Sequence, residues 1–177
     1  MKRLLVILCF LMAFVVEMNG QTAKGTYAFL DATNSARVAA LGNTVLSVYD
    51  SDIQLGIFNP SLINGDMHNA LALSYVNYYA GINYMTAQYG RTFNKLGSFV
   101  ATVQFHSYGD FKYADEQGNV SGTFKPSDYN IMIGWGRQLT PHWSIGANIK
   151  FAGIQYDTFK TFAIAVDVAG HYRTNNG

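Results

Sequence analysis

The sequence predicts an all-β fold, specifically a transmembrane antiparallel β-barrel, on three observations. Charged residues make up 13% of the chain, about half of the roughly 25% typical of globular domains, while aromatic residues make up 15%. Apolar residues alternate with polar or small ones in one segment after another. The alternating segments are about 10–14 residues long, which suits tilted strands that cross a bilayer better than the 5–6 residues usual in soluble domains.

The first twenty residues have the organisation of a secretory signal peptide. A basic start, Met1 to Arg3, precedes an apolar run from Leu4 to Val16, and Gly20 supplies a small residue before Gln21. The apolar run is shorter than the roughly 20 residues that a membrane-spanning helix needs. We therefore expect residues 1–20 to be removed on export, with an uncleaved anchor or a buried helix as the alternative. Export together with a barrel predicts the bacterial outer membrane.

The next segment precedes the regular strands and is less regular. Residues 35–41 predict a short N-terminal helix, with Asn34 or Ser35 as the N-cap and Gly42 as the stop signal. Residues 44–49 predict a first, weaker strand. Asn59 and Pro60 predict a turn into a short irregular segment.

The long segments that follow have one apolar face and one polar or small face. Because successive side chains of a strand point to opposite sides, one set is expected to face lipid and the other the lumen. Asp167 falls on the lumen side, where we expect it to pair with a cation such as Lys150. The residues predicted to face lipid are Phe99, Ala101, Val103, Ile131, Ile133, Ile145, Ile149, Ile164 and Val166.

The connections alternate between short and long, as in outer-membrane barrels with short periplasmic turns and longer external loops. Residues 94–97 and 139–142 predict periplasmic turns, and residues 80–81 predict a tight external one. Residues 109–127 predict a long external loop in which charged and aromatic residues interleave. Interfaces favour aromatic anchors within a polar rim, whereas Phe111 and Tyr113 could instead continue the membrane girdle upward. Phe124 lies far into this loop along the sequence, which fits a girdle less well unless the loop folds back as a strand pair. Gly118, Asn119 and Gly122 could provide the turn of such a protruding hairpin. The candidate partner-binding residues of the loop are Asp110, Phe111, Tyr113, Asp115, Glu116 and Phe124.

The strand count indicates that part of the barrel is missing. Six clear strands and the weaker one give roughly seven, and an open sheet of that size would leave unpaired edges in lipid. Asn176 and Gly177 also predict a hairpin turn that needs a strand after it. We therefore expect residues 21–177 to be the N-terminal portion, about the first half, of one barrel domain. The soluble alternative is a β-sandwich or a lipocalin-like barrel.

Motifs for catalysis and ligand binding are scarce, so we predict a non-enzyme with no catalytic, metal or cofactor residues. The four histidines, at positions 68, 106, 142 and 171, have no metal-ligand spacing, and no GxSxG, P-loop or GxGxxG motif occurs. Removal of residues 1–20 leaves ten basic and ten acidic residues, which argues against nucleic acid as a partner. It also removes Cys9, so the mature chain can form no disulfide.

Several stretches resemble the FadL-related outer-membrane barrels of Bacteroidota, and most closely their PorQ-like branch in the type IX secretion system. They are residues 35–42, which include Arg37 and Gly42, residues 50–52, residues 58–62, which include Asn59 and Pro60, and residues 68–79, which include Asn77. Residues 108–111 and parts of the long loop also match. The resemblance covers nearly all of residues 27–172.

The resemblance implies a barrel of 14 strands, about twice this chain. It implies a non-catalytic member of a cell-surface attachment complex with PorU-, PorV- and PorZ-like proteins, embedded in outer-membrane lipid. The PorQ-like member is expected to dock the peripheral PorZ-like protein at the surface.

Three functional hypotheses compete. The first is the secretion-complex barrel that docks a partner. The second is a FadL-like transporter of hydrophobic small molecules, which would need a hydrophobic lumen pocket and a lateral opening. The third is a barrel enzyme such as an outer-membrane lipase, for which no positioned nucleophile and base are visible. The polar lumen face, with Thr102, Gln104, Asn148 and Lys150, favours the first hypothesis over the second.

Overall fold

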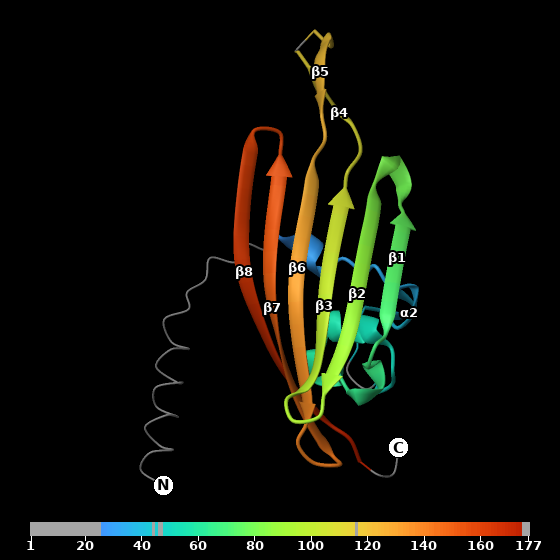
Figure 1. Ribbon diagram of the computed structural model, residues 1–177. Helices are drawn as coiled ribbons and strands as arrows, with labels where there is room; N and C mark the ends of the chain where they lie inside the picture. Colours follow the sequence, from blue (N-terminus) through green and yellow to red (C-terminus); the bar gives the residue numbers. More distant parts are fainter. Residues whose placement is uncertain (1–25, 44, 46–47, 116, 175–177) are drawn as a thin grey trace, which may run out of the picture.

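The computed structural model of the chain describes residues 26–43, 45, 48–115 and 117–174. Six long strands form one antiparallel sheet in the order β1-β2-β3-β6-β7-β8, and a two-stranded ribbon, β4-β5, extends from it between β3 and β6 (Figure 1). The strands are β1 (Leu71–Asn77), β2 (Asn83–Phe93), β3 (Gly97–Ser107), β4 (Phe111–Ala114), β5 (Val120–Phe124), β6 (Ser127–Gln138), β7 (Trp143–Tyr156) and β8 (Phe159–Tyr172). The prediction of an antiparallel all-β fold is confirmed.

Short helices dominate the described residues before β1. They are η1 (Ala28–Asp31), α2 (Ala36–Ala40), η2 (Ile53–Ile57), η3 (Pro60–Leu62) and η4 (Gly65–Met67), and η5 (Tyr79–Gly81) joins β1 to β2. The predicted short helix is confirmed as α2. It begins after Ser35 because the Ser35 side chain accepts a hydrogen bond from the backbone N–H of Val38. Gly42 follows it with a φ of 77°, a conformation that favours glycine at a helix end. No helix in the described residues is long and apolar enough to cross a bilayer.

The register of the sheet confirms the alternation predicted from the sequence. Ile133 of β6, for example, pairs with Ala101 of β3 on one side and Ile149 of β7 on the other, so residues of like character share a row. All nine residues predicted to face lipid lie on the same face of the sheet, which we call the apolar face. Its exposed large side chains include Leu73, Tyr75, Met85, Tyr89, Val103, Phe105, Tyr129, Ile131, Ile133, Ile149, Phe151, Phe162, Ile164, Val166 and Val168.

The opposite, inner face is covered by the N-terminal segment, the described residues between Tyr27 and Met67 (blue to teal in Figure 1). This segment reaches both edges of the sheet. The Tyr27 hydroxyl hydrogen-bonds Thr161 of β8 at 3.0 Å, and the Ser74 hydroxyl of β1 donates to the carbonyl of Asn34. The polar inner face therefore contacts protein over much of its width rather than open solvent.

Polar side chains of the sheet hold the N-terminal segment by donating to its backbone carbonyls. Gln88 donates to Ile53 O at 3.3 Å, and Asn148 donates to Gly56 O at 3.0 Å. A further bond, 2.8 Å long, runs from Ser144 Oγ to Ser61 O. These bonds explain why the inner face is polar although it is buried, since buried backbone carbonyls need donors.

Glycines on three strands let the backbone of the N-terminal segment lie directly on the sheet. A Cβ atom at Gly146 would be 2.2 Å from Pro60 O, and one at Gly136 would be 2.3 Å from Ile63 O. A Cβ atom at Gly90 would be 2.4 Å from Met67 O. The absence of side chains there is a condition for this packing.

Apolar packing within the segment completes the core. Val38, Val45, Leu55 and Leu62 form one buried cluster that contains no strand residue. A second buried cluster joins the segment to β3, and its members are Ile53, Ile63, Met67 and Val100. The segment therefore has a core of its own and shares the second one with the sheet.

The predicted weak strand at residues 44–49 is wrong for the residues that the structure describes. Residues 45, 48 and 49 belong to no strand, and Val45 is buried in the first cluster. Val45 packs against residues of the short helices instead of pairing with a strand. The sheet accordingly has six strands among the described residues instead of roughly seven. The predicted signal peptide, residues 1–20, and the turn signal at residues 176–177 lie outside the described residues.

The connections sort to the two ends of the sheet as predicted. The turns at residues 94–96 and 139–142 lie at one end, which we call the turn end (Figure 1). At the other end, the hairpin end, lie η5, the β4–β5 ribbon and the turn between β7 and β8. The long predicted loop and the tight connection at residues 80–81 therefore share one end.

Candidate partner-binding hairpin

The long loop predicted between β3 and β6 is an ordered hairpin. Strands β4 and β5 pair from Phe111 opposite Phe124 to Ala114 opposite Val120, with a register shift between Tyr113 and Ala114. The hairpin rises beyond the other connections of the hairpin end (Figure 1). Its position makes it the most projecting surface of the described chain.

One carboxylate organises the tip of the hairpin. The Asp115 side chain accepts hydrogen bonds from the backbone N–H of Gln117 and Asn119, at 3.0 and 2.7 Å, and from the Asn119 side chain at 2.9 Å. These bonds, first among them that of the Asn119 side chain, lower the pKa of Asp115. Gly118 takes a φ of 84°, which glycine adopts without strain. The predicted turn around Gly118 and Asn119 is thus confirmed.

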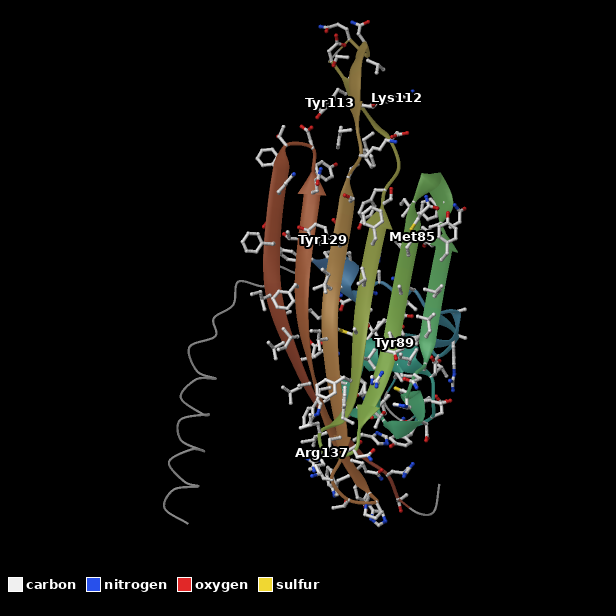
Figure 2. All side chains as sticks on the ribbon, viewed as in Figure 1. Met85, Tyr89, Lys112, Tyr113, Tyr129 and Arg137 are labelled. Atoms are coloured by element: carbon white, nitrogen blue, oxygen red, sulfur yellow. The ribbon has the colours of Figure 1, made fainter. Side chains whose placement is uncertain are left out.

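Aromatic rings fill the base of the hairpin. Phe124 packs against Phe111, Tyr113 and Tyr156 of β7, with ring centroids 5.6, 4.8 and 5.3 Å apart. The Tyr113 hydroxyl also hydrogen-bonds Asp157 in the β7–β8 turn, and this bond raises the pKa of Tyr113. The cluster anchors the hairpin to the neighbouring turn, so the hairpin is a supported projection. Figure 2 shows Tyr113 and Lys112 on it.

The register changes the role expected for Phe124. The sequence suggested that it lies far out in the loop, but it pairs directly with Phe111 and therefore lies at the base. The chain returns along itself, so separation along the sequence does not measure height. Lys125 and Asp110 face each other beside this pair in an exposed ion pair of 3.1 Å.

The predicted loop residues separate into two groups. Asp110, Phe111, Tyr113 and Phe124 meet at the base, whereas Asp115 lies at the tip. Glu116 lies outside the described residues. Sequence reasoning missed Tyr156 and Asp157, which brace the hairpin, because no local signal links the β7–β8 turn to a loop more than 30 residues away. The tip presents exposed Val120 beside the polar turn.

Residues of the resemblance motif hold the N-terminal segment together. Arg37 forms ion pairs with Asp50 and, at 3.2 Å, with Asp52. Its hydrogen bond is the main reason that the pKa of Asp50 is lowered. Asn59 donates to Val45 O at 3.2 Å and accepts from the Ser61 backbone.

The remaining motif residues are also structural. Pro60 begins η3, where its fixed φ suits the first position of a helix. Asn77 donates to the Asn83 side chain at 2.8 Å across the β1–β2 connection.

One further prediction concerns a charged residue on the inner face of the sheet. Lys150 pairs with Asp167 at 2.7 Å across β7 and β8, so the expected ion pair is confirmed. Among the described residues, no group of three or more His, Cys, Asp or Glu side chains is arranged to hold a metal ion.

Comparison of the chain with family models, with curated proteins and with solved structures gave no match.

Proposed function

We propose that this protein is a non-catalytic β-barrel component of the outer membrane that docks a surface partner through the β4–β5 hairpin. The observation that carries the proposal is the pairing of two features: a wide apolar face opposite a protein-covered inner face, and a braced hairpin that projects beyond that apolar face.

The height of the apolar face supports a location in a membrane. On β6 the polar margins are Ser127 and Arg137, ten residues apart, and the outward side chains between them are apolar or aromatic. Ten residues at about 3.3 Å each, tilted by about 40°, span about 25 Å, which matches the apolar band of outer-membrane barrels.

Aromatic residues near both margins of the apolar face support the same location. Tyr75, Phe105 and Tyr129 lie toward the hairpin end, and Phe93 and Trp143 lie at the turn end. Rings with an apolar body and a polar tip favour the boundary between lipid and water.

The edges of the sheet support closure into a barrel. Within the described chain, the outer edges of β1 and β8 pair with no strand. Unpaired backbone groups are not tolerated in lipid. We therefore include in the proposal further strands of the same protein that join β1 and β8.

The hairpin supports docking rather than simple solvation. Its base is held by aromatic contacts to Tyr156, and its tip combines exposed Val120 with the polar turn at Asp115. A braced projection loses little conformational freedom on binding, which favours affinity.

Membership in a type IX attachment complex is carried by the sequence resemblance, which implies a PorZ-like surface partner and no catalytic role. Transport of hydrophobic molecules is less well supported. A transporter needs an apolar pocket on the inner face, whereas Gln88, Ser144 and Asn148 there bind the backbone of the N-terminal segment.

The test is a shortened hairpin in the full-length protein. Replacing residues 114–121 by Asn-Gly joins Tyr113 to Gly122, which are paired in the structure, through a two-residue turn. The aromatic base stays intact, so outer-membrane abundance should be unchanged while co-purification of the PorZ-like partner is lost. The matched control replaces the β2–β3 turn, residues 94–96, by Asn-Gly at the opposite end of the sheet.

Two outcomes would overturn parts of the proposal. Unchanged partner co-purification with the shortened hairpin would reject docking at this site. Recovery of the unaltered protein outside the outer-membrane fraction would reject the barrel itself.

A further inference from the structure

Two arginines lie on the apolar face at the turn end. Arg91 is near the end of β2 and Arg137 near the end of β6, and both are exposed. Strand alternation places Arg91 on the same face as Tyr89, and Arg137 on the same face as Ile133. Figure 2 shows Arg137 close to the turn end of β6, well below Tyr129. The arginines thus lie where the apolar band meets the turns.

The register places the two arginines near each other. Arg91 pairs with Phe99, Phe99 pairs with Trp135, and Arg137 follows Trp135 by two residues. Two strand intervals of about 4.8 Å and two residues of about 3.3 Å separate their backbones by roughly 10 Å across and 7 Å along the sheet. Both guanidinium groups can therefore reach the same row of lipid headgroups.

Neither arginine forms an ion pair with a carboxylate of the described chain. The Arg91 guanidinium lies over the Phe93 ring, 5.9 Å from its centroid. At the hairpin end, the margin over the same strands is neutral, with Asn83, Ser107 and Ser127. Unpaired positive charge therefore marks one margin of the apolar face over β2, β3 and β6.

We propose that Arg91 and Arg137 bind the phosphate group of a membrane glycerophospholipid in the leaflet at the turn end. This inference rests on the proposed membrane location. A guanidinium offers paired N–H donors to phosphate oxygens, and a long side chain at the edge of the bilayer can extend its charge into the headgroup layer. An arginine at this depth costs little, in contrast to one at the bilayer midplane.

The test measures phospholipid affinity directly. The full-length protein, purified and stripped of lipid in detergent, is titrated with phosphatidylglycerol, and bound lipid is counted by native mass spectrometry. Arg91→Gln and Arg137→Gln should each weaken binding about fivefold and the double variant about 25-fold, as expected for basic side chains at an anionic surface. Arg91→Lys/Arg137→Lys, which keeps the charge, should retain most of the affinity.

Lys112→Gln is the matched control, because Lys112 is an exposed cation on the hairpin, beyond the apolar band (Figure 2). Equal affinity in the unaltered protein and the double glutamine variant would overturn the inference, as would an equal loss in Lys112→Gln. Preferential, arginine-dependent binding of lipid A would overturn the assignment to glycerophospholipid. Because each variant is first checked for recovery in the outer-membrane fraction, failure of the proposed location is seen separately.

Discussion

Replacing Gly146 by alanine would disturb the contact between β7 and the N-terminal segment at its closest point. Gly146 lies on the inner face, and an added Cβ would be 2.2 Å from Pro60 O, 2.3 Å from Pro60 C and 2.6 Å from Ser61 N. All three atoms belong to backbone, so no side-chain rotation relieves the clash. Either η3 or β7 must move.

The size of the movement gives the expected cost. Carbon and oxygen atoms approach to about 3.3 Å at closest, so η3 must shift by roughly 1 Å. Overpacking of this kind costs about 1–3 kcal/mol. The same shift stretches the 2.8 Å bond from Ser144 Oγ to Ser61 O, which contributes about 1 kcal/mol. We expect Gly146→Ala to lower the free energy of unfolding by about 2–4 kcal/mol.

Urea titration of the folded full-length protein in detergent, followed by tryptophan fluorescence, measures this quantity. The control is Gly170→Ala, because Gly170 lies on the apolar face of β8 and an added Cβ there meets nothing within 4 Å. Its stability should change by less than about 0.5 kcal/mol. If both variants were equally stable, the packing of residues 60–61 on β7 would be refuted.

Three further predictions address the sheet and the N-terminal segment. Ile164→Arg, in the middle of the apolar face of β8, should cost about 2–4 kcal/mol in a lipid bilayer and far more than Ala163→Arg on the opposite face; equal costs in reversible folding would reject the lipid-facing register. Lys150→Met leaves the partly exposed Asp167 carboxylate without its cation and should cost about 1–2 kcal/mol, much of which a double variant with Asp167→Leu recovers if the ion pair is the cause. The hydrogen bond from Arg37 lowers the pKa of Asp50. The stabilisation by the Arg37–Asp50 ion pair is therefore present at neutral pH and is lost as the pH falls below 3.8, the ordinary pKa of an aspartate. Unfolding midpoints measured between pH 2 and pH 7 should show this loss in the unaltered protein and not in Asp50→Asn, and parallel curves would contradict it.

Some elements of the fold were predictable from the sequence, and others were not. Alternation along residues 99–105 and 162–168 predicted the two faces correctly, because the side-chain period of a strand is fixed by its backbone. The short helix after Ser35 was also predictable, because its capping signals are local. The strand proposed at residues 44–49 was wrong for the described residues, because apolar character alone does not distinguish a buried irregular segment from a strand.

The candidate hairpin was foreseen only in part. Its length, its end of the sheet and its turn near Gly118 followed from the sequence. The height of Phe124 did not, because the register that pairs it with Phe111 depends on the fold of the whole hairpin. The brace from Tyr156 was hidden for the same reason, since β7 and the hairpin meet only after the sheet has formed.

By itself, the sequence determined the antiparallel all-β class, the face to which each strand residue points, the need of Asp167 for a cation such as Lys150, and the helix after Ser35. These features depend on short-range periodicity, on turn and capping chemistry, and on the need to neutralise a charge on the inner face of the sheet. Only the tertiary structure decided that the polar inner face holds the N-terminal segment, through carbonyl contacts such as that of Ser61. Glycines such as Gly146 looked unremarkable in the sequence, because their role depends on backbone that arrives from more than 80 residues earlier in the chain. Such close approach is a property of two segments together, and no local pattern in either one encodes it.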